Sequence, residues 1–431
     1  MERERRANRF VNVQPFGQNS RLVSLVARSI YPLLALVCVF AAAASAACSR
    51  SDGEAPKSPR LGASVRALAS AQLVETIAAI PQEALPPPAD PEPEPSLVLA
   101  AGGDVNFGRE CGQEILRDPA YAPLAGLGAA WTSADARFAN LESQLSDQNG
   151  ETQSPRHRLI FTGPPGGAAV LSLSGVSVVS TANNHAWDYG RGALLETMTN
   201  LEQAGVGFVG TGRDAPEAYR PYVLRIKGRT IALFAVTHVW NQPPFATHPG
   251  RELVAWADVP RLRANIERAR REHDFVLVSY HGGEEYVHAP TERVQWFARQ
   301  MMALGVDAVI GHHPHVPQGI GHVTGRPILY SLGNLAFAGH QDRPWTRQSF
   351  FARLTLTKGK PPALAACPFA LDGHRPRSFQ LQRESLAIEL FRRHLVELSR
   401  YTGGAVVSGP DELGCLTVAS PAAQTSRSSS N

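Results

Sequence analysis

Three of the fourteen histidines of this chain, His312, His313 and His315, lie within the stretch IGHHPHVPQ. They follow an apolar run that ends at Ile310, and this run predicts a buried strand. Pro314 favours an irregular loop after the strand, and only on such a loop can two histidines at this spacing reach one centre. Because imidazole is the commonest metal ligand among side chains, the stretch predicts metal binding.

Several other apolar runs also end in polar residues that can ligate a metal. These residues are Asp104 and Asn106, Asn140 and Glu142, Asn184, His185 and Asp188, His281 with Glu284 and Glu285, and Asn334. Taken alone, each has an ordinary explanation as a turn residue, a helix cap or a core side chain. In open α/β sheets, however, ligands bind beyond the carboxyl ends of the strands. We therefore expect these strand ends to meet at one pocket.

The residue types of this set indicate the chemistry. Imidazole and carboxylate without thiolate suit Mn, Zn or Fe, so we expect one or two divalent transition metals as the cofactor. Two such ions can clamp the attacking and leaving oxygens of a phosphoryl transfer and lower the pKa of a bound water. A histidine beside them is suited to general-acid work, because its pKa lies near working pH.

Composition argues against other function classes. Residues 1–47 carry six arginines and two acidic residues, and basic and acidic side chains balance over the rest of the chain. No basic face for nucleic acid is therefore predicted. The sequence also contains neither a GxxxxGK[ST] phosphate loop nor a GxSxG nucleophile motif.

The N-terminus predicts export. Arg21 and Arg28 precede an apolar stretch, 29–48, that ends in small residues, which is the plan of a signal segment. Three outcomes remain open: cleavage after Ala44-Ser45-Ala46, lipidation at Cys48, or retention as a membrane anchor. We expect a protein of the cell envelope that is membrane-anchored, periplasmic or extracellular.

Strands and helices alternate along the middle of the chain, which predicts an α/β fold. Expected strands are 96–104, 136–142, 176–184, 207–212, 230–237, 274–282, 307–313 and 327–334, and expected helices are 191–204, 259–272, 290–304 and 385–400. The domain organisation predicted from these patterns is an export signal or anchor (1–47), a proline-rich disordered linker (48–95), a main domain (96–370), a helical extension (371–412) and a disordered tail (413–431). One disulfide among Cys111, Cys367 and Cys415 is allowed, but the sequence does not pair them.

The motifs GGDVNFGR, ANLE, TANNHAWDYG, YHGGEEYVHAPTERVQ, GVDAVIGHHPHVPQG and ILYSLGNLAF together resemble the CapA family. Its members are called poly-γ-glutamate or capsule biosynthesis proteins, and the family is similar to calcineurin-like metallophosphoesterases. The resemblance implies two packed β-sheets flanked by helices (α/β/β/α), with metals at the loop end.

The resemblance also implies a role for each matching residue. The metal ligands would be Asp104, Glu142, Asn184, His281, His313 and His315. His185 would protonate a leaving group with Asp188 beside it, and Arg109, Asn140 and Asn334 would bind substrate. Asn106 departs from the pattern, because a phosphoesterase has a histidine there, and this leaves one metal position short of a ligand.

Two functions follow as expectations. The first is an exported protein of capsule or poly-γ-glutamate biosynthesis with a metal-dependent, phosphoesterase-like hydrolase site, which acts on an anionic polymer or a phosphate-containing envelope substrate. The second is a non-catalytic accessory that binds the polymer within a capsule-assembly complex. Both place the protein at the membrane through its N-terminal anchor or lipid, with capsule-assembly proteins as partners and no nucleic acid.

Overall fold

The computed structural model describes residues 95–118, 120–339 and 343–421, all within one compact unit, Asp90–Asn431. The predicted export segment 1–47, the linker up to residue 94 with Cys48, and residues 422–431 lie outside the described residues. Within the described part, no helix has the length and apolar character needed to cross a membrane.

The larger of two main sheets has ten strands in the order β17-β18-β15-β14-β1-β2-β5-β6, with β13 beside β1 and β16 beside β15. β13, β1, β2, β5 and β6 are parallel to one another, and β14 to β18 continue the sheet with antiparallel pairing. The bounds are β1 Leu97–Asn106, β2 Ala136–Leu141, β5 Val178–Ser180, β6 Gly207–Val209, β13 Asn334–Phe337, β14 Gln348–Leu356, β15 Ala363–Asp372, β16 Arg375–Ser378, β17 Val406–Pro410 and β18 Leu416–Ala419.

The second sheet has six strands in the order β11-β12-β10-β9-β8-β7. Its strands are β7 Tyr222–Ile226, β8 Arg229–Thr237, β9 Phe275–His281, β10 Ala308–His312, β11 Ile320–Val323 and β12 Arg326–Leu329. The four central strands, β8, β9, β10 and β12, are parallel, so their carboxyl ends point the same way. A short ladder of β3 Gln144–Leu145 and β4 Thr162–Gly163 lies apart from both sheets.

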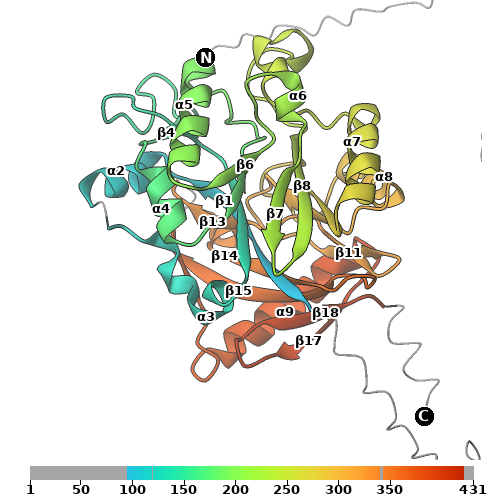
Figure 1. The fold of residues 1–431 in the computed structure, drawn as a ribbon. Helices are drawn as coiled ribbons and strands as arrows, with labels where there is room; N and C mark the ends of the chain where they lie inside the picture. The colour runs from blue at the N-terminus through green and yellow to red at the C-terminus, as the bar shows by residue number, and fades with distance from the viewer. Residues whose placement is uncertain (1–94, 119, 340–342, 422–431) are drawn as a thin grey trace, which may run out of the picture. The chain divides into compact units, whose positions relative to one another are not determined.

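Helices cover the outer faces of the two sheets (Figure 1). α2 Arg109–Arg117, α3 Gly128–Thr132 and α4 Gly167–Leu173 lie on one side, and α7 Val259–Glu272 and α8 Glu292–Ala303 lie on the other. The remaining helices are α5 Gly190–Gln203, α6 Ala215–Ala218 and α9 Ser385–Arg400, with 3-10 turns η1 Pro123–Leu127, η2 Phe245–Thr247, η3 Pro249–Glu252 and η4 Pro344–Arg347.

Side chains alternate along the strands between a core that lies between the two sheets and cores that lie under the helices. Along β1, Leu97 and Leu99 face the core between the sheets, whereas Ala100 packs toward the helices of the first sheet. Along β9, Leu277 faces the same central core, and Val276 packs toward α7 and α8. Both faces of these strands are covered, which explains their continuous apolar runs. The expected α/β sandwich flanked by helices is confirmed by this layering.

The predicted strands and helices of the main domain all form, with shifts of a few residues at their ends. The predictions for the C-terminal region need correction. β16, β17 and β18 join the first sheet through β15, so the chain has no domain boundary near residue 370. The tail expected from residue 413 contains β18, whose Leu416 is fully buried. Strands of four or five residues, such as β16, β17 and β18, carry too few residues for their alternation to be recognised.

A disulfide joins two strands of this C-terminal part. Cys367 on β15 is bonded to Cys415, directly before β18, across a sequence separation of 48, and Cys111 is buried and free. The bond closes a long loop that contains β16, α9 and β17, so it restricts the unfolded chain strongly.

Replacing both Cys367 and Cys415 by serine should lower the free energy of unfolding by about 3–4 kcal/mol, because the loop closed by the bond is long. Urea unfolding of the oxidised protein measures this loss. Adding a reductant should destabilise the wild type to a similar degree and leave the double variant unchanged. Equal stability of the oxidised wild type and the variant would contradict the pairing.

Candidate metal centre

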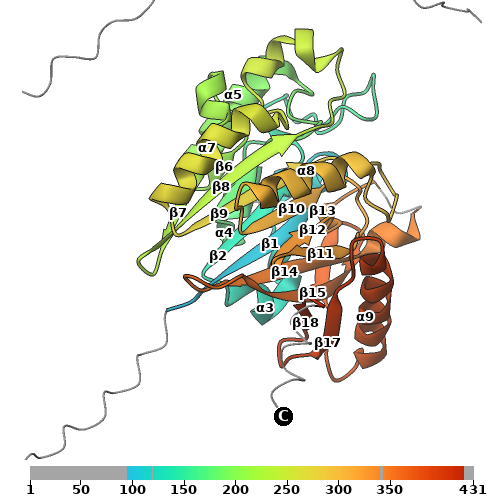
Figure 2. The ribbon, with the colours of Figure 1, turned by 90° about the vertical axis from the view of Figure 1, so that its right-hand side faces the viewer.

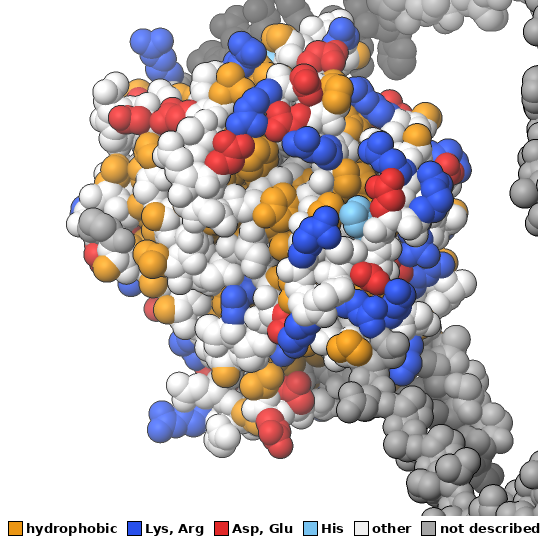
Figure 3. All heavy atoms as spheres, viewed as in Figure 1, with side chains coloured by type: hydrophobic (Ala, Val, Ile, Leu, Met, Phe, Trp, Pro, Cys, Tyr) orange, Lys and Arg blue, Asp and Glu red, His pale blue; other side chains and the backbone are white. Residues whose placement is uncertain are grey.

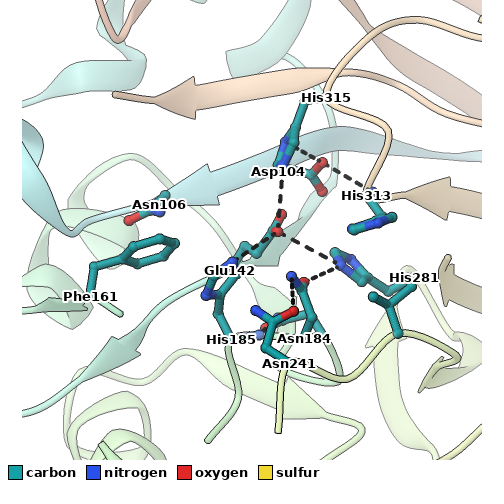
Figure 4. A network of polar contacts seen from close by, with 12 residues as sticks. Asp104, Asn106, Glu142, Phe161, Asn184, His185, Asn241, His281, His313 and His315 are labelled. Atoms are coloured by element: carbon teal, nitrogen blue, oxygen red, sulfur yellow. Dashed lines mark hydrogen bonds and ion pairs between the residues drawn. The ribbon is translucent and has the colours of Figure 1, made fainter. Parts of the chain in front are cut away.

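Polar side chains from both sheets converge where the parallel strands end (Figure 4). Asp104 lies on β1, Glu142 follows β2, and Asn184 and His185 follow β5. From the second sheet, His281 ends β9, and His313 and His315 follow β10. All six residues predicted as metal ligands therefore reach one place, and each of them is buried.

These side chains form two groups that could each hold an ion. One group consists of Asp104, Glu142 and His315, and the other consists of Glu142, His281 and His313. Within each group the ligand atoms all lie within 4.8 Å of one another. Glu142 belongs to both, as a bridging carboxylate of a two-metal site would.

The Glu142 carboxylate is the strongest indication of a cation. It is fully buried, and neither of its oxygens has a hydrogen-bond partner among the described residues. Burial, together with the charge of Asp104, raises the pKa of Glu142 well above its usual value. Burying an unpaired carboxylate is costly, so a bound cation would remove a large penalty. The residues present therefore fit a divalent metal.

Three imidazoles face this carboxylate. The Nε2 atoms of His281, His315 and His185 lie 3.7, 3.8 and 4.0 Å from Glu142 Oε1. Burial and the neighbouring His313 hold the pKa of His281 well below its usual value, and burial and His315 lower the pKa of His313 to about 4. His281 and His313 are therefore neutral near pH 7, which is the form that binds metals.

Asp104 is held as a carboxylate. It accepts hydrogen bonds from Asn140 Nδ2 at 2.9 Å and from the backbone N–H of His313 at 3.2 Å. Burial raises its pKa, but the nearby His312 and His315 outweigh burial, and the pKa of Asp104 lies well below its usual value. The two acids of the site therefore differ: Asp104 accepts hydrogen bonds, whereas Glu142 accepts none among the described residues and has only imidazoles at ion-pair distance.

Asn140 and Asn334, which are predicted to bind substrate, contact the side chains of the ligand groups. Both are almost completely buried among the ligands. Asn140 Nδ2 lies 3.2 Å from His281 Nδ1, and Asn334 Oδ1 lies 2.9 Å from His315 Nδ1. With Nδ1 engaged by Asn334, Nε2 of His315 is directed to the metal site. These two residues orient ligands, a role that residue type alone does not reveal.

Asn184 occupies the position predicted for a ligand. Its Oδ1 lies 2.8 Å from Nε2 of His281, and its Nδ2 donates to Asn241 Oδ1 at 3.3 Å. Asn184 can therefore add a fourth ligand to the group of Glu142, His281 and His313. Asn241 lies on the loop after β8 and was not identified from the sequence, because it is a lone polar residue in a loop.

The loop after β10 aims two of the ligands. His313 and His315 both adopt positive φ, at 101° and 58°, a region that residues other than glycine rarely occupy. Pro314 stands between them, as the loop prediction required. His312, the first of the cluster, instead packs against Phe138 at the end of β10, and it belongs to neither ligand group.

His185 lies at the rim of the site, held by residues of two different segments. Its Nδ1 lies 2.8 Å from Asp188 Oδ2, which also accepts the backbone N–H of Phe161 at 3.1 Å. The Phe161 ring stacks on His185 with 4.1 Å between centroids, and the Arg109 guanidinium lies 4.6 Å from the Phe161 centroid. Sequence reasoning missed Phe161, because it lies in an irregular segment without periodicity.

Asn106, the departure noted in the sequence, contributes to neither ligand group. Its Oδ1 accepts from the backbone N–H of Gly108 at 2.6 Å, which forms the turn before α2. Its Nδ2 is buried without a partner among the described residues. The group of Asp104, Glu142 and His315 therefore keeps only three ligands.

Residues 98–339 match the family model described as "Bacterial capsule synthesis protein PGA_cap". The chain belongs to this family. It is 28% identical over 309 residues to the "PGA biosynthesis protein CapA" of Bacillus subtilis, covering 70% of this chain and 79% of that protein. The family predicted from the strand-end motifs is thus confirmed.

Two further comparisons concern this member of the capsule synthesis family. A "Probable polyglutamine synthesis accessory protein" of Mycobacterium tuberculosis is 28% identical over 298 residues, which cover 65% of this chain and 77% of that protein. Among solved structures, the NAD nucleotidase of Haemophilus influenzae is similar with a TM-score of 0.39 and 11% identity, over 68% of this chain and 62% of that one.

Replacing Glu142 by glutamine should stabilise the metal-free protein. Because the folded-state pKa of Glu142 is raised above its usual value of 4.5, the wild type loses stability as pH rises from there toward that folded-state pKa. Glutamine has no such proton to lose. In chelator at pH 8 we expect Glu142→Gln to raise the free energy of unfolding by roughly 1–3 kcal/mol, with little difference at pH 4.

Urea unfolding at the two pH values, with and without Mn²⁺, measures these effects. Added Mn²⁺ should stabilise the wild type more than Glu142→Gln. Glu267→Gln, on the exposed side of α7, is the matched control and should behave as wild type in every condition. A Glu142→Gln protein that is less stable than wild type in chelator at pH 8 would show that Glu142 is not an uncompensated anion.

Proposed function

We propose that this capsule synthesis family member is an exported hydrolase or transferase that acts on phosphate esters of an envelope polymer. The observation that carries the proposal is the buried Glu142 carboxylate, which has no hydrogen-bond partner among the described residues and is shared by two ligand groups. Divalent ions bound there would polarise a phosphoryl oxygen and lower the pKa of a bound water.

The chain's own residues supply the remaining chemistry. Asp188 fixes His185 through Nδ1, so Nε2 is directed to the ligand side and can hold the proton that a leaving oxygen needs. Phe161 limits the movement of the His185 ring by stacking on it. Arg109, which lies over Phe161, is the cation best placed to hold an anionic group at the rim.

The proposed location is the cell envelope, with attachment through the N-terminal segment, either as an anchor or through a lipid on Cys48. The disulfide between Cys367 and Cys415 supports export, because such bonds persist in oxidising compartments. The proposed partners are an anionic polymer or another phosphate-containing envelope substrate and the proteins of a capsule-assembly complex.

A second candidate function is a non-catalytic accessory that binds or transfers the polymer. Two observations favour it. Asn106 replaces the histidine that a phosphoesterase would use, so one ligand group is incomplete. The relative from Mycobacterium tuberculosis also carries the word accessory in its name. The two candidates differ in whether the purified chain turns over a phosphate ester.

His185→Ala tests the enzyme directly. If His185 protonates the leaving group, its loss should slow hydrolysis of an alkyl phosphate by 10²–10⁴-fold. It should slow p-nitrophenyl phosphate much less, because that leaving group needs no proton. Metal content should stay at the wild-type level. Equal loss on both substrates would remove the acid role, and absence of hydrolysis in the Mn²⁺-loaded wild type would favour the accessory.

Metal content of single variants tests the two ligand groups separately. We expect the wild type to bind two ions, with the tighter one at Glu142, His281, His313 and Asn184. His315→Ala should therefore keep about one ion, whereas His313→Ala should lose the tighter ion and the double variant should retain none. Elemental analysis after dialysis gives these counts, with His322→Ala on β11 as the control. Full occupancy in the double variant would mean that the site is misassigned.

A further inference from the structure

Helix α9 has an apolar face on each side. Ile388, Phe391 and Leu395 are buried against the sandwich. On the opposite side, Leu386 and Leu390 are 69% and 55% exposed, and Tyr401, just after the helix, is 66% exposed. A surface helix usually turns charged residues to solvent on that side. The exposed apolar face of α9 therefore has no role in the packing of the domain.

A second segment extends this face. His394, one helical turn after Leu390, stacks with Trp345 of η4 at 6.0 Å between ring centroids, and Trp345 is 64% exposed. His288 contacts both rings, at 5.3 and 5.8 Å, and the neighbouring Val287 is exposed as well. We name the surface made by Leu386, Leu390, His394, Trp345 and Tyr401 the α9 patch.

The α9 patch differs in composition from the face of the molecule that Figure 3 shows. On the face of Figure 3, hydrophobic side chains are scattered among charged ones. The α9 patch gathers four large exposed side chains along one side of α9, with Glu397 between His394 and Tyr401, and Figure 2 shows α9 at the margin of the described part with its outer side uncovered by any labelled element. A contiguous exposed patch of this kind marks an interaction site.

Cations surround the α9 patch. Arg343 and Arg347 flank Trp345 and are exposed. On α9 the charged side chains pair with one another, Glu389 with Arg392 and Arg393 and Glu397 with Arg400, so the positive charge that borders Trp345 comes from Arg343 and Arg347. Exposed leucine and tryptophan bordered by arginine is the composition that binds the interface of an anionic bilayer.

The α9 patch also connects to the metal centre. The Arg343 guanidinium lies 3.8 Å from the centroid of the Tyr286 ring, and that ring lies 6.0 Å from the ring of His315. A surface that held Trp345 and Arg343 against lipid headgroups would therefore bring the headgroups close to the ligand side chains.

We infer that the α9 patch docks this protein onto an anionic lipid surface, with the mouth of the metal centre toward membrane-bound substrate. The inference rests on the proposed export and N-terminal attachment. A random-coil linker with the number of residues in the predicted segment 48–95 would span on the order of 40 Å, so the proposed attachment would keep the α9 patch within reach of the bilayer. A weak surface contact is then enough, because the local concentration of lipid is high.

Trp345 provides the probe. The full chain is reconstituted in phosphatidylglycerol-containing vesicles with either brominated or ordinary acyl chains, and tryptophan emission is compared. With six tryptophans in the chain, we expect brominated lipid to remove roughly one sixth of the emission through Trp345. This quenching should be absent in Trp345→Phe and fall at least about fivefold in the double variant Leu386→Ser, Leu390→Ser. It should also weaken in phosphatidylcholine or in high salt.

Leu173→Ser is the matched control, because Leu173 is 71% exposed on α4, and it should leave the quenching unchanged. Flotation of the same vesicles separates the two proposals. A chain that floats without quenching at Trp345 would overturn the docking surface and leave the attachment intact, and a chain that does not float would overturn both. Dimers that Leu386→Ser and Leu390→Ser abolish, without quenching, would assign the α9 patch to a second copy instead.

Discussion

The candidate metal centre depends on the burial of two carboxylates, Asp104 and Glu142, side by side at the end of the sandwich. Asp104 keeps its charge because Asn140, His312, His315 and a backbone N–H face it, whereas Glu142 has no hydrogen-bond partner among the described residues. In the absence of a cation, folding forces the Glu142 carboxyl toward its protonated form. Burial of Glu142 therefore lowers the free energy of unfolding of the metal-free protein. A bound cation would remove this penalty, so metal binding would be coupled to folding stability.

The architecture explains how distant residues meet at this place. Parallel strands in both sheets end at the same side of the sandwich, so each strand delivers one or two polar residues to a shared edge. Gly103 permits the closest approach there, because a Cβ at that position would lie 1.8 Å from the carbonyl oxygen of Gly333. Asn334 Oδ1 then accepts from Nδ1 of His315, which leaves Nε2 of that ring free to bind.

The strands and most of the candidate ligands could be predicted from the sequence, because each apolar run marks a strand and the polar residues after it mark the carboxyl end of that strand. Asp104, Glu142 and His313 were found in that way. The direction in which a side chain points is harder to predict. Asn140 and Asn334 were predicted to bind substrate, and their side chains contact the candidate ligands Asp104 and His315. Phe161 and Asn241 approach from loops without periodicity, and the strands after residue 370 have only four or five residues each, so tertiary contacts alone reveal them.

Each ligand group contains side chains from both sheets. Asp104 and Glu142 belong to the first sheet, and His281, His313 and His315 belong to the second. A bound ion would thus cross-link the sandwich at one end of its seam, while the apolar core holds the remainder. Loss of the ion would loosen the two halves at that end first, so the metal-free protein would expose the seam to proteases before it unfolds.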